Sequence, residues 1–353
     1  MRRLVLLLVA LLVVAAAGWW YAEWRLSAPF KGYEGEEQFV EIAPGDGPAT
    51  IGRKLAEAGV IRDEWTFRAA LWRTGSARRL KAGEYRFDRP IGTVAVVDRI
   101  ARGDVYMRSL TFREGLTIRE MARIFEEQRF GLAADFLQAS RRVGLIEDLD
   151  PRATDLEGYL FPDTYALPRQ ANAAALVERM VQGFRRVFTE ELREAARAGG
   201  LTVRQTVSLA ALVEKETAKP EERPIVAGVY HGRLRRGMPL QADPTVIYAL
   251  ERAGRYDGNL TREGLQYDSP YNTYRYPGLP PGPIASPGRG ALEAAARPAD
   301  VDFLYFVSRN DGSHAFARTL DEHNRNVATW RKIKNGEQPA PVAPSPAKPD
   351  PTG

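Results

Sequence analysis

A carboxyl group at the end of an apolar helix is the feature of this chain that most suggests chemistry. Residues 203–217 predict a helix whose inward face runs from Val203 to Glu214. At about 100° per residue, Glu214 falls within roughly 20° of the direction of Val203, whereas Glu216 points to the opposite side. Burial disfavours the charged form of a carboxyl group. We therefore expect Glu214 to keep its proton above the usual pKa, as a general acid must.

The structural alternative for Glu214 is a buried ion pair with an arginine, and this helix alone leaves both explanations open. A hydrolase acting on a glycoside would need a second carboxyl group at roughly 5–9.5 Å. The candidates are Glu157, Glu216 and Asp243. Glu216 is expected to point away, and Asp243 followed by Pro244 has the pattern of a helix N-cap with proline in the first turn.

Polar side chains that could bind a substrate gather around a long loop at residues 268–290, which is rich in Pro, Gly and Tyr. Long irregular loops in compact domains are usually functional or disordered, and the aromatic residues argue against disorder. The candidate binding residues are Gln241, Tyr271, Asn272 and Thr273. Their amide and hydroxyl groups suit sugar hydroxyl and acetamido groups, but Asn and Thr also stabilise turns, so both roles stay open.

A second loop, residues 155–165, is unusually aromatic and acidic. It is either a turn packed on the core by its aromatic side chains or the rim of a glycan-binding site, with Glu157 as a binding residue. Near the C-terminus, His314 could orient Glu214 or the substrate, although a histidine beside a Phe on a strand is usually a packing residue.

Composition excludes several functional classes. The chain has 353 residues, 44% of them hydrophobic and 27% charged, as is typical of globular proteins. Its net charge of +5 is spread without a dense basic block, so we expect no nucleic-acid partner. It has no cysteine and three histidines, which predicts neither a disulfide framework nor a metal site. No phosphate-binding glycine loop is present, and no cofactor is expected.

The N-terminus predicts a membrane anchor. An uncharged run follows Arg2 and Arg3 and is about long enough, at ~20 residues, to cross a bilayer. Aromatic residues typical of a membrane interface stand at its outer end: Trp19, Trp20, Tyr21 and Trp24. A cleaved signal peptide is the alternative, because residues 15–17 are all Ala; the aromatic residues favour the anchor. The expected segments are a cytoplasmic N-terminus (1–3), a transmembrane helix (4–24) and a tether (25–37).

The rest of the chain predicts an α+β protein. Strand and helix patterns alternate over residues 38–130, where Thr117 and Glu120 have the spacing of a capping box. The first of these units resembles LysM, a βααβ module that binds glycans, so we expect a small LysM-like α+β domain. A mixed helical and strand catalytic domain follows at 131–335, and a Pro-rich tail at 336–353 is expected to be disordered.

Several long segments in the same order resemble the YceG-like endolytic murein transglycosylase family over nearly the whole chain. The segments are LEGYLFPDTY (156–165), ALVEKET (211–217), LQADPTVIY (240–248), YNTY (271–274) and GLPPG (278–282). The catalytic glutamate of that family lies in its E-K-E-T segment, where this chain has Glu214. Tyr159 stands in the 155–165 loop where the family has a Trp, which leaves an aromatic residue there.

The resemblance implies a single-pass protein of the bacterial inner membrane whose catalytic domain is periplasmic. It implies a lyase that cuts peptidoglycan glycan strands internally between N-acetylmuramic acid (MurNAc) and N-acetylglucosamine (GlcNAc), leaving 1,6-anhydro-MurNAc ends. Glu214 alone would act as acid and then base. Peptidoglycan synthase complexes are implied as partners. Two alternatives are a hydrolytic muramidase and a noncatalytic scaffold that binds peptidoglycan.

Overall fold

The computed structural model describes residues 2–334 and divides them into two compact units. Unit 1 comprises the chain up to Arg108 together with Ala166–Arg169, and unit 2 comprises Ser109–Tyr165 and the chain from Gln170. The expected α+β class is therefore observed, but the chain divides at Arg108 rather than near residue 130. The tail expected to be disordered, 336–353, lies outside the described residues.

Unit 1 begins with one long helix, α1 (Arg2–Ser27), of which Val5–Ser27 is long and apolar enough to cross a membrane. The segment expected to be a free tether is instead packed on the unit. Leu26 is buried, Arg25 binds Asp63 at 2.8 Å, and Phe30 pairs with Ile91. α1 extends into the start of the segment 25–37, as far as Ser27, and contacts α3 there.

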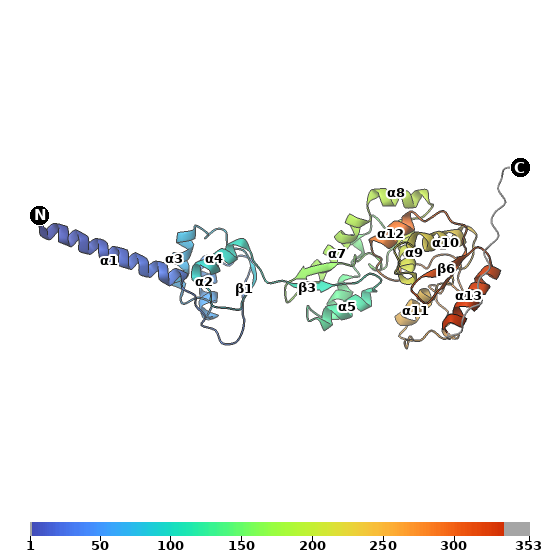
Figure 1. The fold of residues 1–353 in the computed structure, drawn as a ribbon, viewed down its shortest axis with the longest axis horizontal. Coiled ribbons are helices and arrows are strands. Elements are labelled where there is room, and N and C mark those ends of the chain that lie inside the picture. Colours follow the sequence, from blue (N-terminus) through green and yellow to red (C-terminus); the bar gives the residue numbers. More distant parts are fainter. Residues whose placement is uncertain (1, 335–353) are drawn as a thin grey trace. The chain divides into compact units, whose positions relative to one another are not determined.

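The core of unit 1 is a βααβ arrangement followed by one more helix (Figure 1). The elements are β1 (Gln38–Ile42), α2 (Pro48–Glu57), α3 (Glu64–Thr74), β2 (Gly83–Phe87) and α4 (Thr93–Arg102). β1 and β2 are antiparallel, with Val40 opposite Tyr85, and both of these side chains are buried. This βααβ order is the one expected of a LysM-like domain, and both the LysM identity and glycan binding by this unit stay predictions.

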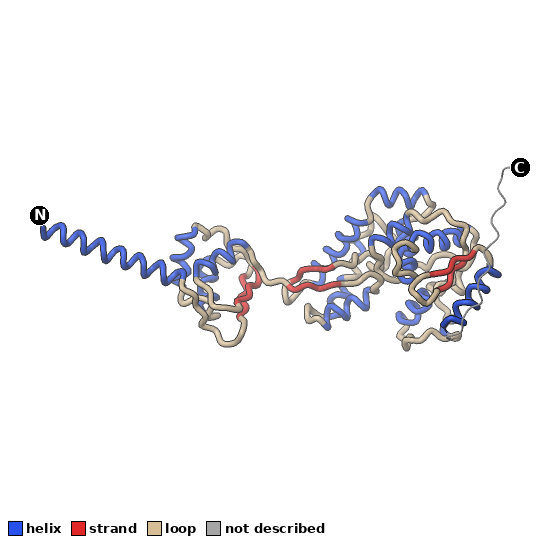
Figure 2. Tube along the Cα trace, in the orientation of Figure 1, coloured by secondary structure: helices blue, strands red, loops and turns tan. Residues whose placement is uncertain are grey.

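Unit 2 is mainly helical, with short two-stranded pairs, β3 with β4 and β5 with β6 (Figure 2). Its elements are β3 (Arg108–Thr111), α5 (Ile118–Glu127), α6 (Ala133–Ala139), the 3-10 helix η1 (Val143–Leu145), β4 (Thr164–Leu167), α7 (Ala173–Val187), α8 (Glu190–Ala198), α9 (Val203–Glu216), α10 (Arg223–Arg235), α11 (Asp243–Arg252), η2 (Gly264–Gln266), α12 (Arg289–Ala296), β5 (Tyr305–Ser308), β6 (His314–Ala317) and α13 (Leu320–Lys334). Arg108 of β3 and the last two residues of β4 are assigned to unit 1.

The central element of unit 2 is α9, the helix predicted to carry Glu214. It packs against α8, α10, α11 and α12, and all of residues 206–213 are buried. A helix that is buried all round needs a nearly continuous apolar sequence, which this segment has. Its start is fixed by a capping box, in which the Thr202 hydroxyl accepts from the Gln205 amide and the Gln205 side chain accepts from the Thr202 amide. The unit is thus built around a buried helix whose last turn carries Glu214.

The predicted capping box at the start of α5 is confirmed and gives a stability test. The Thr117 hydroxyl accepts from the Glu120 amide at 3.2 Å, and Glu120 accepts from the Thr117 amide at 2.8 Å. We expect Thr117→Ala to lower the free energy of unfolding of unit 2 by about 1 kcal/mol, because the Glu120 amide loses its acceptor and the Glu120 carboxylate loses the Thr117 hydroxyl. Urea denaturation measures this. Thr154→Ala, at an exposed position outside any helix, is the control, and equal effects of the two substitutions would contradict the capping role.

Candidate active site around Glu214

Glu214 is held at the C-terminal end of α9 with only 6% of its side chain exposed. One carboxylate oxygen, Oε2, accepts a hydrogen bond from the backbone N–H of Gly288 at 2.9 Å. The other, Oε1, accepts from Nη2 of Arg223 at 3.1 Å. Gly288 is the N-cap of α12, so the carboxyl group lies at the start of that helix, where free backbone amides and the helix dipole favour a negative charge.

A second carboxyl group shares this arginine. Nη2 of Arg223 is 3.3 Å from Oε2 of Glu114, whose side chain is 45% exposed. Glu114 lies in the loop between β3 and α5, about a hundred positions before Glu214. The sequence did not identify Glu114 or Arg223 as site residues. Neither belongs to a motif that includes α9. The site is therefore a cluster of two glutamates on one guanidinium group.

The pKa of Glu214 is raised above the usual value, and its causes oppose one another. Burial is the largest cause and raises the pKa, and the negative charge of Glu114 raises it further. The Gly288 amide and the Arg223 charge lower it but do not cancel the increase. The ion pair that formed the structural alternative for Glu214 is thus present, yet the pKa of the carboxyl group stays above its usual value, which is the direction that a general acid needs.

Glycines allow the elements of this cluster to approach closely. A Cβ atom on Gly288 would lie 1.7 Å from Oε1 of Glu114, and one on Gly290 would lie 2.5 Å from Nη1 of Arg223. The two loops are also joined by backbone hydrogen bonds of 2.8 Å, from the Gly115 amide to Ser286 and from the Ser286 amide to Leu116. Side chains at these glycines would push apart the groups that contact Glu214.

Glu216, expected to point to the side opposite Glu214, is partly buried and binds a different residue. It accepts a hydrogen bond from the Tyr230 hydroxyl of α10 at 2.8 Å, and burial raises its pKa. Pointing away from Glu214 does not bring Glu216 fully into solvent, because α10 packs against α9. Asp243 is not the expected cap either: Ala242 is the N-cap of α11 and its first turn shows no side-chain cap, while the Asp243 carboxylate accepts from Tyr274.

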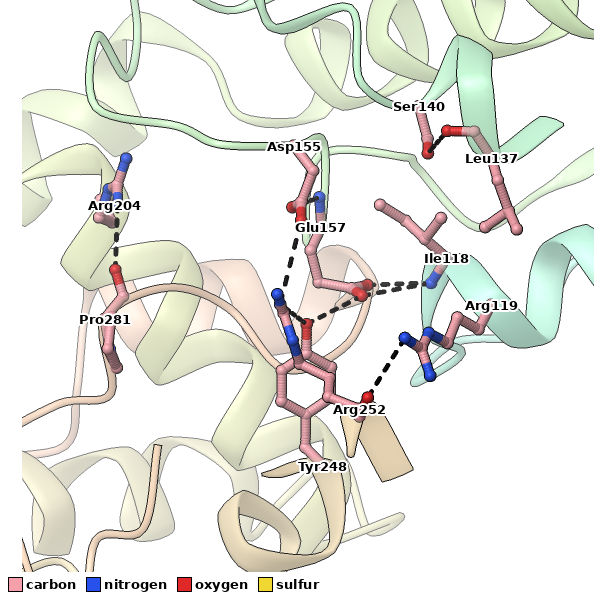
Figure 3. A network of polar contacts seen from close by, with 10 residues as sticks. All are labelled: Ile118, Arg119, Leu137, Ser140, Asp155, Glu157, Arg204, Tyr248, Arg252 and Pro281. Carbon is pink, nitrogen blue, oxygen red and sulfur yellow. Dashed lines mark hydrogen bonds and ion pairs between the residues drawn. The ribbon is translucent and has the colours of Figure 1, made fainter. Parts of the chain in front are cut away.

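Glu157 occupies a separate buried position beside a cavity of about 430 Å³ (Figure 3). Its carboxylate accepts from the Ile118 amide at 3.1 Å and from the Tyr248 hydroxyl at 3.2 Å. Burial, with a contribution from Asp155, raises the pKa of Glu157 to about 8. Arg252 lies on the same wall, within hydrogen-bond distance of the Tyr248 hydroxyl. A protonated Glu157 at neutral pH could donate a hydrogen bond into this cavity.

The two carboxyl sites are connected by one loop. Glu114 and Gly115 lie against Glu214, and a few residues later the Ile118 amide binds Glu157. This loop therefore joins the position proposed for acid–base chemistry to the cavity. Within residues 2–334, no group of three or more metal-binding side chains is placed to hold a metal ion.

The four candidate binding residues near the 268–290 loop separate into two kinds. Asn272 and Thr273 are buried, and their side chains stabilise the loop. Asn272 donates to the carbonyls of Leu265 and Tyr267, and the Thr273 hydroxyl accepts from the Ala242 amide. For these two residues the geometry favours loop stabilisation over free binding groups.

Gln241 and Tyr271 have parts that a ligand could reach. Gln241 is exposed and has a φ of 51°, and its backbone amide donates to Thr273. Tyr271 is partly exposed, and its ring centre lies 5.0 Å from that of Tyr248, which binds Glu157. Tyr271 is therefore placed near Glu157.

Burial and pairing give Tyr159 and His314 structural roles. Tyr159 was expected to supply an aromatic platform, but it is 1% exposed and its hydroxyl binds Asp150 at 2.7 Å. The turn explanation thus holds for this part of the 155–165 loop. His314 does not contact Glu214 and instead lies with Nδ1 2.7 Å from Glu222, whose other oxygen accepts from the His314 amide. This pair fastens β6 to the start of α10.

Comparison with known proteins identifies relatives that span most of the chain. An endolytic murein transglycosylase of Bacillus subtilis is 28% identical over 84% of this chain and 85% of its own length. One from Streptococcus pneumoniae D39 is 29% identical over 82% of this chain, which spans 57% of that longer protein. Among solved structures, a YceG-like protein from Listeria monocytogenes has a TM-score of 0.56 at 30% identity, covering 82% of this chain and 98% of its own.

The profile of the YceG-like family matches residues 40–329, which include most of unit 1 and nearly all of the described part of unit 2. The match thus contains both Glu214 and Glu157. On this evidence the chain belongs to the YceG-like family.

Proposed function

We propose that this chain cuts peptidoglycan glycan strands internally between MurNAc and GlcNAc, leaves 1,6-anhydro-MurNAc ends, and uses Glu214 as its single acid and base. The observation that carries this proposal is the state of Glu214. It is the residue at the position of the family's E-K-E-T glutamate, it is buried, and its pKa is raised. Neither the product nor the catalytic role follows from family membership alone.

The enzyme class rests on the relatives. Those from B. subtilis and S. pneumoniae are both named endolytic murein transglycosylases, and the first is matched over most of both chains. The chain is accordingly a murein transglycosylase, that is, a lyase of peptidoglycan. Its substrate is the glycan strand, and Glu157, Gln241 and Tyr271 are proposed to bind it, with Asn272 and Thr273 shaping the loop.

The proposed reaction needs only one carboxyl group. Protonated Glu214 donates its proton to the GlcNAc O4 as the bond from that oxygen to C1 of MurNAc breaks. The resulting carboxylate then accepts the proton of the MurNAc C6 hydroxyl, whose oxygen forms the new bond to C1. The nucleophile belongs to the sugar itself, so high effective molarity replaces a positioned water molecule. Glu214 ends the cycle protonated again.

The surroundings of Glu214 fit both halves of this cycle. Burial and the nearby Glu114 favour the protonated form before the first step. Once the proton has left, the Gly288 amide and Arg223 are within hydrogen-bond distance of the carboxylate and stabilise it. Glu114 and Arg223 are therefore proposed as positioning residues that balance the two protonation states of Glu214.

The proposed location is the inner membrane, with α1 as a single-pass anchor, the N-terminus in the cytoplasm and both units in the periplasm. The apolar segment Val5–Ser27 supports this, as do the two arginines that precede it. A cleaved signal peptide remains the alternative for the same segment. Synthase complexes that polymerise glycan strands would be natural partners, because they produce the substrate near the membrane.

A hydrolytic muramidase is the second candidate, and Glu114 is the observation that favours it. It places a second, half-exposed carboxyl group on the same arginine as Glu214, where the sequence had offered no clear partner. The two reactions differ in product mass, since hydrolysis adds water and the lyase reaction does not. A noncatalytic scaffold would tolerate loss of the Glu214 carboxyl group.

The first prediction concerns Glu214→Gln, assayed with purified glycan strands and mass spectrometry. We expect 1,6-anhydro ends from the unmodified protein and at least a ~10²-fold slower reaction from the variant, because Gln cannot transfer the proton. Glu293→Gln, at an exposed position on α12, is the control and should react normally. Reducing ends would identify a hydrolase, and products unaffected by Glu214→Gln would exclude its catalytic role.

The second prediction uses the opposing charges next to Glu214. A general acid loses activity as the pH rises through its pKa. Glu114→Gln removes a charge that raises the pKa of Glu214, so the alkaline loss of activity should move to lower pH. Arg223→Gln removes a charge that lowers the pKa of Glu214, so the loss of activity should move to higher pH.

The measurement is the rate of glycan cleavage as a function of pH for the unmodified protein and both variants. Arg297→Gln, which removes an exposed arginine paired with Glu191, is the matched charge control and should leave the profile in place. Shifts of the two variants in the same direction would rule out Glu214 as the titrating acid.

A further inference from the structure

Two large aromatic side chains in unit 1 lack a packing role. On α3, Trp65 is 76% exposed and Trp72 is 83% exposed, and both lie on the face opposite the buried Phe67 and Leu71. Tryptophan is rarely left this exposed, and clustered exposed apolar groups usually mark a binding surface. Ala69 lies between them on the same face and is also exposed. We call Trp65, Ala69 and Trp72 the tryptophan face.

The helix that carries this face is tied at both ends to α1. Its N-cap, Asp63, binds Arg25 at 2.8 Å, and Arg73 in its last turn forms an ion pair with Glu23. Glu23 and Arg25 are two residues apart, which is a rise of only about 3 Å along α1. Both ends of α3 therefore meet α1 at nearly the same height, so α3 lies across α1 near its C-terminal end (Figure 1).

The height of that crossing coincides with the end of the apolar span. Glu23 is the first charged residue after an uncharged run of α1 that begins at Leu4. About 20 apolar residues are needed to cross the hydrocarbon layer, so Glu23 and Arg25 mark the level at which α1 leaves it. A helix lying across α1 at this level is close to parallel with the membrane surface.

The tryptophan face is continuous with the last apolar turn of α1. A groove of about 310 Å³ between the two helices is lined by Ala22 and Leu26 of α1 and by Trp65 and Ala69 of α3. Trp65 therefore lies beside the turn of α1 that leaves the bilayer. This continuity distinguishes the face from an isolated exposed aromatic residue elsewhere on the unit.

Positive charges accompany the tryptophans. The guanidinium group of Arg68 lies 5.3 Å from the centre of the Trp65 ring, and Arg62, Arg78 and Arg79 are exposed nearby in the chain. Helices that lie in the membrane interface combine Trp with Lys or Arg in this way, because the ring occupies the headgroup region and the cation attracts anionic lipid.

We propose that α3 is an interfacial helix, with Trp65 and Trp72 seated in the headgroup region of the leaflet from which α1 emerges. Unit 1 is then held against the bilayer at two places, α1 and the tryptophan face, instead of turning freely on the anchor. Exposed aromatic residues can also stack on sugars. A bilayer is favoured here because the face adjoins the membrane span.

The absence of cysteine from the chain allows a direct test by single-site labelling. Ala69→Cys in the full chain, carrying a nitroxide label, is reconstituted into vesicles of phosphatidylethanolamine and phosphatidylglycerol. The collision rates of the label with oxygen and with a water-soluble nickel chelate are then compared. We expect a ratio of oxygen to nickel accessibility several-fold higher than at Glu41→Cys, an exposed site on β1 at the end of unit 1 away from α1 (Figure 1).

The matched variant adds Trp65→Ala and Trp72→Ala to Ala69→Cys. Both rings are outside the core, so the fold should survive, which circular dichroism checks. We expect the ratio at position 69 to fall toward that at position 41. A label at position 69 that resembles position 41 before the tryptophans are removed would overturn the proposal. An accessibility ratio at position 69 that does not change when the two tryptophans are removed would also overturn the proposal. So would a ratio that differs from that at position 41 only after glycan strands are added.

Discussion

The candidate site depends on one carboxyl group whose burial is unfavourable and only partly compensated by its neighbours. Glu214 lies at the end of a helix enclosed on all sides, and water reaches 6% of its side chain. Burying a charge is unfavourable unless it is paired, and the Gly288 amide and Arg223 supply that pairing. Burial raises the pKa of Glu214 more than this pairing lowers it, and the negative charge of Glu114 on the same arginine adds to the increase. The glycines at 115, 288 and 290 and the loops that carry them make this arrangement sterically feasible.

Local patterns predicted the parts of the fold that depend on neighbouring residues. The α9 helix, the capping box at Thr117 and the alternation of strands and helices in residues 38–130 follow from periodicity and capping chemistry. The burial of Glu216 could not be predicted in the same way. The direction of a side chain on a helix does not show whether another helix, here α10, covers it. Asp243 shows the same limit. Its sequence has the pattern of a helix N-cap, but in the structure its carboxylate accepts a hydrogen bond from Tyr274.

The site itself was only partly predictable. Glu214 was identified from the helix and from the family resemblance, whereas Glu114 and Arg223 reach it through tertiary contacts between distant segments. Residue type alone could not distinguish a side-chain amide that binds substrate from one that stabilises a loop. The Asn272 amide does the second, because it donates to backbone carbonyls of its own loop. At the other end of the chain, hydropathy did not predict that the start of the tether contacts the folded unit. The contact depends on ion pairs between α1 and α3, which a hydropathy pattern cannot show.

The most direct test of the central claim is the pKa of Glu214 itself. Carboxyl groups labelled with ¹³C can be titrated by NMR in the unmodified protein and in Glu214→Gln, and the resonance absent from the variant belongs to Glu214. The comparison is needed because burial also raises the pKa of Glu157 and Glu216. The account predicts that this resonance titrates above the usual value of about 4.5 for glutamate. Titration at or below that value would mean that Arg223 holds Glu214 as a permanent carboxylate, which could not start the reaction as an acid.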